Sequence, residues 1–136
     1  MLDSVILFSS SEDNIVLRRS LDYSPQIIDF GKATPLKATQ SLAKRVSVLS
    51  VREQLQKRRR YPWIAPELVS GKETPSQQTD VYSVGFVVNC IARRRPIAVL
   101  KNVEALAYVD ESAKRASLEY ILQVLNDRSN NLSVCM

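Results

Sequence analysis

The stretch TDVYSVGFVVNCIA at residues 79–92 decides the fold, because it carries the clearest helical pattern of apolar residues in the chain. Thr79 or Asp80 can cap the N-terminus of such a helix. Apolar residues then recur at helical spacing, at Val81, Val84, Val88 and Ile91. Phe86 and Val87 add apolar surface on other sides, so the pattern predicts a buried central helix.

Two shorter helices are expected after the central one. Asn102 can cap the first, whose apolar positions are Val103, Leu106 and Ala107. Ser117 can cap the second, whose apolar positions are Leu118, Ile121, Leu122 and Leu125. Beyond Asp127 the chain offers little apolar surface, so we expect residues 129–136 to form a disordered tail.

The N-terminal part has the pattern of short strands and long loops. Runs of β-branched and apolar residues at 5–8, 15–17 and 26–28 predict three strands separated by polar, turn-rich segments. Residues 32–60 are polar and basic and predict a long surface loop. The spacing of three apolar residues permits one modest amphipathic helix inside it, at Val48, Val51 and Leu55. The expected fold class is therefore α+β, mostly α, with a small β-hairpin.

The composition limits the classes of function. The chain has 136 residues and a net charge of +5, and its apolar runs are far shorter than the roughly 20 residues that cross a bilayer. Two cysteines and no histidine make neither a disulfide framework nor a metal cluster. The expected location is the cytoplasm or the nucleus. The short apolar runs predict no membrane partner. The basic runs at 57–60 and 93–95 are interpreted as solvated loops or helix ends, so nucleic acid is not expected as a partner either.

Four short motifs follow one another along the chain. Residues 29–31 read Asp-Phe-Gly, residues 65–67 read Ala-Pro-Glu, and residues 80–85 read Asp-Val-Tyr-Ser-Val-Gly. Residues 115–118 read Arg-Ala-Ser-Leu. In this order and general spacing the motifs resemble those of the C-terminal lobe of eukaryotic protein kinases, of the tyrosine-kinase-like or a related group. The resemblance implies a partial kinase domain at residues 1–128.

The resemblance also implies cofactor-binding residues and a missing catalytic base. Asp29 matches the aspartate that holds Mg²⁺ on the phosphates of ATP, and Asn14 resembles the asparagine that holds a second metal ion. An Asx turn between strands explains Asn14 equally well. Ser9 falls at the position of the catalytic aspartate. A hydroxyl cannot replace a carboxylate as general base near neutral pH, and losing a positioned base costs roughly 10²- to 10⁴-fold in rate.

Three further matches imply structural roles. Glu67 resembles the glutamate that forms a buried ion pair with a late arginine, which is Arg115 in this chain. Asp80 resembles the aspartate that anchors the catalytic loop from the start of the central helix. Its position is explained almost as well by the preference of a helix N-terminus for a carboxylate.

We therefore expect a truncated or pseudokinase-like lobe without the N-lobe, because no Gly-rich loop and no strand lysine precede the motifs. The family activity, ATP-dependent phosphorylation of protein Ser/Thr or Tyr, is expected to be lost in this chain alone, and a protein partner or an N-lobe is expected to be needed. One alternative is an incomplete gene product of an active kinase. Another is a basic adaptor that binds nucleic acid or acidic proteins through residues 57–60 and 93–95.

The stability of the isolated chain is expected to be marginal. In the family the central helix packs against a helix that precedes the catalytic loop, and the sequence contains no such helix. Each exposed Val or Ile side chain forfeits roughly 1.5–3 kcal/mol of burial free energy.

Overall fold

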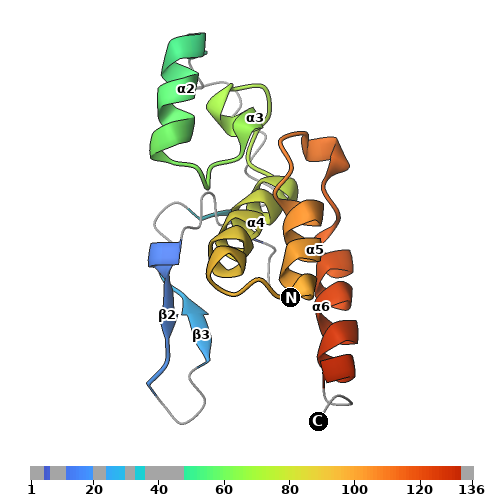
Figure 1. Ribbon diagram of the computed structural model, residues 1–136. Helices are drawn as coiled ribbons and strands as arrows, with labels where there is room; N and C mark the ends of the chain where they lie inside the picture. The colour runs from blue at the N-terminus through green and yellow to red at the C-terminus, as the bar shows by residue number, and fades with distance from the viewer. Residues whose placement is uncertain (1–4, 7–11, 20–23, 30–32, 36–47, 133–136) are drawn as a thin grey trace.

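The computed structural model describes residues 5–6, 12–19, 24–29, 33–35 and 48–132. This part of the chain is mostly helical, with two small antiparallel sheets (Figure 1). Its α-helices are α2 (Val51–Arg60), α3 (Pro66–Val69), α4 (Gln77–Arg94), α5 (Ala98–Ala107) and α6 (Leu118–Leu132). Two 3-10 turns complete them, η1 (Glu12–Asn14) and η4 (Ser112–Lys114). The expected class, α+β and mostly α, is confirmed.

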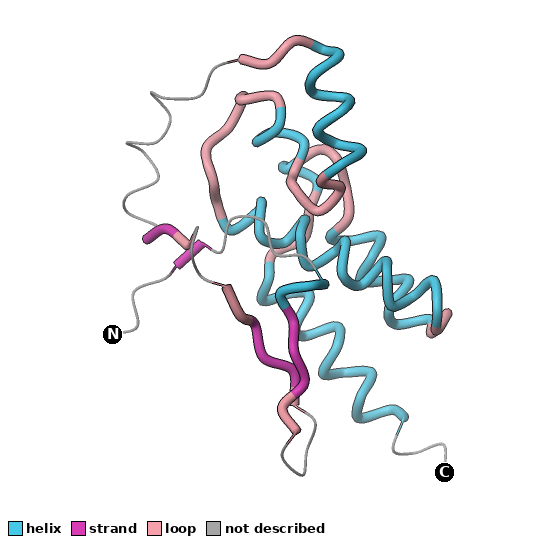
Figure 2. The backbone as a smooth tube through the Cα atoms, turned by 90° about the vertical axis from the view of Figure 1, so that its left-hand side faces the viewer, coloured by secondary structure: helices cyan, strands magenta, loops and turns pink. Residues whose placement is uncertain are grey.

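Each of the two sheets is a single antiparallel pair of strands. In the first, β2 (Ile15–Leu17) pairs with β3 (Pro25–Ile27), which is the predicted hairpin. In the second, β1 (Val5–Ile6) pairs with β4 (Thr34–Pro35), a short strand that the sequence did not predict. Figure 2 shows the β2–β3 hairpin as a narrow projection beside the helices.

The central helix α4 begins earlier than predicted. Its N-cap is Ser76, whose Oγ accepts a hydrogen bond from the backbone N–H of Thr79. In return the Thr79 Oγ accepts from the Ser76 backbone N–H at 3.0 Å, which completes a capping box. Thr79 and Asp80 therefore lie inside the first turn, and the prediction that one of them is the cap was wrong.

The two C-terminal helices also extend further than their apolar patterns indicated. Helix α5 starts at Ala98, directly after an extended Ile97, so Asn102 lies in the middle of the helix and is not its cap. Ser117 does cap α6, because its Oγ accepts from the backbone N–H of Tyr120. Helix α6 then continues to Leu132, so residues 129–132 are helical, against the prediction of a disordered tail. Once a helix is nucleated, each added residue gains a backbone hydrogen bond without a new apolar contact. Residues 133–136 lie outside the described part.

The basic segment before α3 forms a longer helix than expected. Helix α2 includes the whole run 57–60 as its last turn, where cations favour the helix dipole. At its start Ser50 and Glu53 form a capping box, and the hydrogen bond from the Ser50 hydroxyl lowers the pKa of Glu53. None of the described helices combines the length and apolar character needed to cross a bilayer.

The core lies where α5 packs against both α4 and α6 (Figure 1). Its buried apolar cluster is Val81, Val88, Val103, Ala107 and Ile121. The buried face of α4 follows residues 81, 85, 88 and 92. Val84 and Ile91 were predicted to share this face, but they lie on another side of the helix and are 38% and 46% exposed. A hydropathy pattern could not place the face correctly, because Gly85 carries no side chain to mark it.

At Gly85 the backbone at the end of α5 lies very close to the central helix. A Cβ atom on Gly85 would lie 2.6 Å from the backbone nitrogen of Tyr108 and 2.8 Å from the carbonyl carbon of Ala107. These are backbone atoms, which cannot rotate away as a side chain can. The hydrogen bond from the Asn89 amide to the Glu104 carboxylate holds the same two helices together one turn further along.

We expect Gly85→Val to lower the free energy of unfolding by about 3 kcal/mol, because the added methyl groups must push α5 away from α4. Urea denaturation followed by circular dichroism measures the change. Val84→Ala, on the exposed side of the same helix, is the matched control and should cost less than about 0.5 kcal/mol. Equal losses in the two variants would show that α5 does not approach the helix at Gly85.

Candidate functional site

The two candidate metal ligands lie at the same end of the β2–β3 hairpin. The backbone N–H of Ile28 donates to the carbonyl oxygen of Asn14 at 2.8 Å, which extends the strand pairing by one step. Asp29 is the next residue, so the hairpin register brings it close to Asn14. Asp29 is exposed and has a φ of 64°, in the left-handed region that few non-glycine residues adopt. Such a conformation costs on the order of 1 kcal/mol or more and is often found at functional sites.

The donor atoms at this hairpin end suit Mg²⁺. A carboxylate and an amide oxygen are hard ligands, and Mg²⁺ commonly takes only one or two of them, with water and phosphate oxygens supplying the rest. Within the described residues no group of three or more His, Cys, Asp or Glu side chains could hold a metal ion. Ser9, the predicted substitute for the catalytic base, and residues 30–31 lie outside the described part of the chain.

A buried ion pair joins Glu67 to Arg115, as the sequence motifs predicted. The two guanidinium nitrogens of Arg115 donate to the two carboxylate oxygens of Glu67, at 2.5 and 2.7 Å. The Arg115 side chain is fully buried and that of Glu67 is 6% exposed. This is a bidentate pair, the geometry in which arginine binds a carboxylate most strongly.

The remaining donors of Arg115 are all used by backbone carbonyl groups. Nε donates to Val109 at 2.7 Å, and the two terminal nitrogens donate to Gln78 at 2.9 Å and Asp110 at 3.0 Å. The guanidinium also lies 4.9 Å from the ring centre of Tyr82, within the range of a cation–π contact. One side chain therefore ties together α3, the first turn of α4, and the segment that follows α5.

Asp80 lies in the first turn of α4 and is half-buried. This position fits the simpler of the two explanations, a carboxylate that is favoured by the helix N-terminus. The catalytic-loop region that it would anchor in a kinase includes residues 7–11, which are not described. Its anchoring role stays a prediction.

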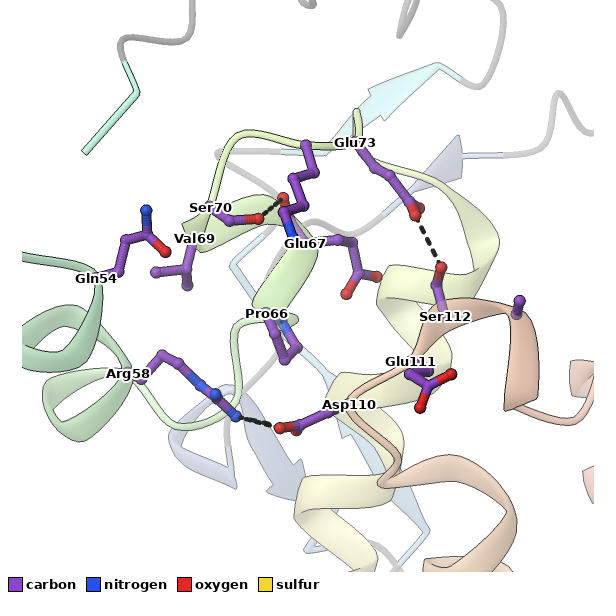
Figure 3. Close-up of a pocket in the computed structure, with 12 residues that line it drawn as sticks. Gln54, Arg58, Pro66, Glu67, Val69, Ser70, Glu73, Asp110, Glu111 and Ser112 are labelled. Carbon is purple, nitrogen blue, oxygen red and sulfur yellow. Dashed lines mark hydrogen bonds and ion pairs between the residues drawn. The ribbon is translucent and has the colours of Figure 1, made fainter. Parts of the chain in front are cut away.

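An open pocket of about 400 Å³ lies beside the ion pair, between α2, α3 and the segment after α5 (Figure 3). Arg58 closes one side of it by donating two hydrogen bonds to Asp110, at 2.8 and 2.9 Å. This contact raises the pKa of Arg58. On another side the Ser112 hydroxyl donates to Glu73 at 2.9 Å. This pocket was not predicted from the sequence, because its walls come from segments far apart in the chain.

Trp63 is a packing residue in this structure. Its ring lies 5.7 Å from that of Tyr61 and 6.1 Å from that of Phe86, measured between ring centres. The Ser83 hydroxyl donates to the Trp63 carbonyl oxygen at 2.9 Å. These contacts fix the segment before α3 onto the central helix.

The chain matches no family model, and no curated protein matches its sequence. The resemblance to protein kinases therefore rests on the order of the sequence motifs.

We expect Glu67→Ala to lower the free energy of unfolding by about 3–5 kcal/mol, because it leaves the Arg115 charge buried without a counter-charge. The double variant Glu67→Leu/Arg115→Met should recover most of this loss. Chemical denaturation of both variants provides the measurement.

The matched control is Asp110→Ala, which removes the exposed ion pair between Asp110 and Arg58. Its partners are 41% and 62% exposed, so the loss should stay below about 1 kcal/mol. A Glu67→Ala variant no less stable than Asp110→Ala would contradict the role assigned to the buried pair.

Proposed function

We propose that this chain is a protein-kinase-related module that does not transfer phosphate on its own and acts by binding another protein. The observation that carries the proposal is the Glu67–Arg115 ion pair. It joins the Ala-Pro-Glu motif to the Arg-Ala-Ser-Leu motif, which lie 48 positions apart in the sequence. Chance matches of short motifs have no reason to meet in a buried bidentate pair, whereas motifs inherited together do.

The chemistry of the motif positions supports a non-catalytic role. Ser9 stands where a kinase has the carboxylate that accepts the proton of the substrate hydroxyl. A serine hydroxyl stays protonated near neutral pH and accepts that proton poorly. If Mg-ATP binds, Asp29 and Asn14 would hold the metal, which would supply positive charge to the phosphate oxygens. We therefore expect this site at most to bind Mg-ATP, because it has no general base for phosphate transfer.

An exposed apolar face of α4 supports the binding role. This face carries three residues at helical spacing, Val84, Val87 and Ile91. The side chains of Val84 and Ile91 are 38% and 46% exposed, and Val87 is half-buried. A shallow hollow of about 320 Å³ lies on this face and is lined in part by Val87, Cys90 and Ile91. Such a ridge on a helix suits packing against a second helix. We propose that an amphipathic helix of a partner protein covers it.

We expect isothermal titration calorimetry to detect at most weak Mg-ATP binding, and none in Asp29→Ala. Radiolabelled ATP should give no phosphate transfer to generic protein substrates at any Mg²⁺ concentration. Robust transfer that Asp29→Ala abolishes would overturn the non-catalytic part of the proposal and favour an active kinase whose gene product is incomplete.

A second prediction concerns the open face of α4. Val81→Ala should lower the free energy of unfolding by about 2 kcal/mol, because Val81 is buried in the core. Val84→Ala, three positions along the same helix, should cost under about 0.5 kcal/mol in the isolated chain. Thermal unfolding of the parent protein should also be broad and of low midpoint.

These stability measurements test whether the face is open. Equal losses for Val81→Ala and Val84→Ala, or a sharp unfolding transition at high temperature, would mean that the face is already covered in the monomer. A partner helix would then have no site there.

A further inference from the structure

Helix α2 exposes an apolar stripe that nothing in the described structure covers. Val48 lies two residues before the N-cap of the helix, and Val51 and Leu55 are at positions i and i+4 within it, so these two share one side of the helix. Val48, Val51 and Leu55 are 79%, 74% and 54% exposed. Helix α2 has no buried residue, so these side chains do not contribute to the core.

Basic side chains border the stripe. Arg52 precedes Leu55 by three positions and Arg59 follows it by four, which places both beside Leu55 on the helix surface. Neither forms an ion pair with any residue in the part of the chain that the structure describes. The helix as a whole carries five basic residues against one acidic residue: Arg52, Lys57, Arg58, Arg59 and Arg60 against Glu53.

The side of α2 next to the stripe holds the helix on the molecule, because Gln54 and Arg58 each follow a stripe residue by three positions. Gln54 and Arg58 line the pocket beside α3, and Arg58 binds Asp110 in the segment after α5. Figures 1 and 2 both show α2 at one end of the molecule, beyond the packed helices α4, α5 and α6. The stripe can therefore meet an external surface while α2 stays attached.

We infer that the stripe of α2, with Arg52 and Arg59 beside it, binds the surface of an anionic membrane, with the helix lying in the plane of the headgroups. Aliphatic side chains enter the boundary between headgroups and acyl chains, and arginines pair with anionic lipids. The helix is roughly 15 Å long, which is too short to span a bilayer and sufficient to lie on one. The sequence prediction of no membrane partner considered only spanning segments, which this mode of binding does not need.

The same features disfavour the other anionic partners. A nucleic acid backbone would use the arginines but would leave the apolar stripe in water. A protein groove that encloses a helix needs access to more of its circumference, and the Gln54–Arg58 side is already occupied. A flat surface needs only the exposed side, so charge and shape together favour a membrane.

Vesicle flotation with the full chain tests the inference. We expect binding to vesicles that contain phosphatidylserine and none to vesicles of phosphatidylcholine alone. Arg52→Gln/Arg59→Gln should weaken the partition by about 25-fold, since each basic residue near an anionic surface contributes roughly fivefold. Val51→Ser/Leu55→Ser should weaken it by about tenfold or more. All these side chains are exposed, so the thermal midpoints should not change.

The matched control is Arg93→Gln/Arg95→Gln, which removes the same charge from exposed positions at the end of α4. It should change the partition by no more than about twofold, because these residues lie away from the α2 stripe. An equal loss in the control would show that only the net charge matters and would overturn the inference.

Three other outcomes would also overturn it. One is the absence of any vesicle binding by the parent protein. Another is unchanged binding by Val51→Ser/Leu55→Ser, which would leave no role for the stripe. The third is that duplex DNA competes fully with vesicles for the protein and binds Val51→Ser/Leu55→Ser as tightly as it binds the parent. That result would identify a general polyanion site instead.

Discussion

The arrangement of the helical part depends on the placement of one charge, the buried guanidinium of Arg115. Its five N–H groups reach the Glu67 carboxylate and three backbone carbonyl groups, so the energetic cost of burying the charge is largely offset. The partners come from α3, the first turn of α4 and the segment after α5. Displacing any of these segments would leave a donor or the charge unsatisfied, and this couples their positions.

The second constraint is the close contact at Gly85. Hydrophobic burial alone would let α4 and α5 pack at several distances and angles, since it has no direction. A glycine opposite the backbone of Ala107 and Tyr108 permits one particularly close approach. That approach also places Tyr108 against Tyr82, whose ring in turn contacts Arg115. The core and the ion pair therefore support each other.

The sequence predicted the kinds of elements better than their faces and ends. The central helix and the final helix follow from apolar spacing, and Ser117 was identified as a cap. The exposed side of α4 was misassigned because Val84 and Ile91 have the same helical spacing as the core residues, and only the position of α5 distinguishes the two sides. The cap at Ser76 was missed because the capping box closes with Thr79, where a glutamate or glutamine is usual.

The candidate site likewise contains one contact that the sequence motifs predicted and others that the sequence did not predict. No periodicity connects Glu67 with Arg115, and the pair was predictable only through the motifs that contain them. The contact between Arg58 and Asp110 had no motif and was not predicted. The hairpin register that brings Asn14 near Asp29 follows from strand pairing, which a short apolar run cannot specify by itself.

Two exposed apolar surfaces remain, on α4 and on α2, and they differ in a way that bears on their partners. The α4 surface is a ridge with a hollow beside it and lies next to the core, so it resembles one side of a protein–protein interface. The α2 stripe lies at the end of the molecule, on a helix that carries four arginines. An apolar ridge with a hollow beside it selects a protein of matching shape, whereas an apolar stripe bordered by arginines suits a surface with anionic groups over an apolar layer. The two sites could therefore be occupied at the same time, with a partner protein on α4 and the membrane on α2, because they lie on different helices.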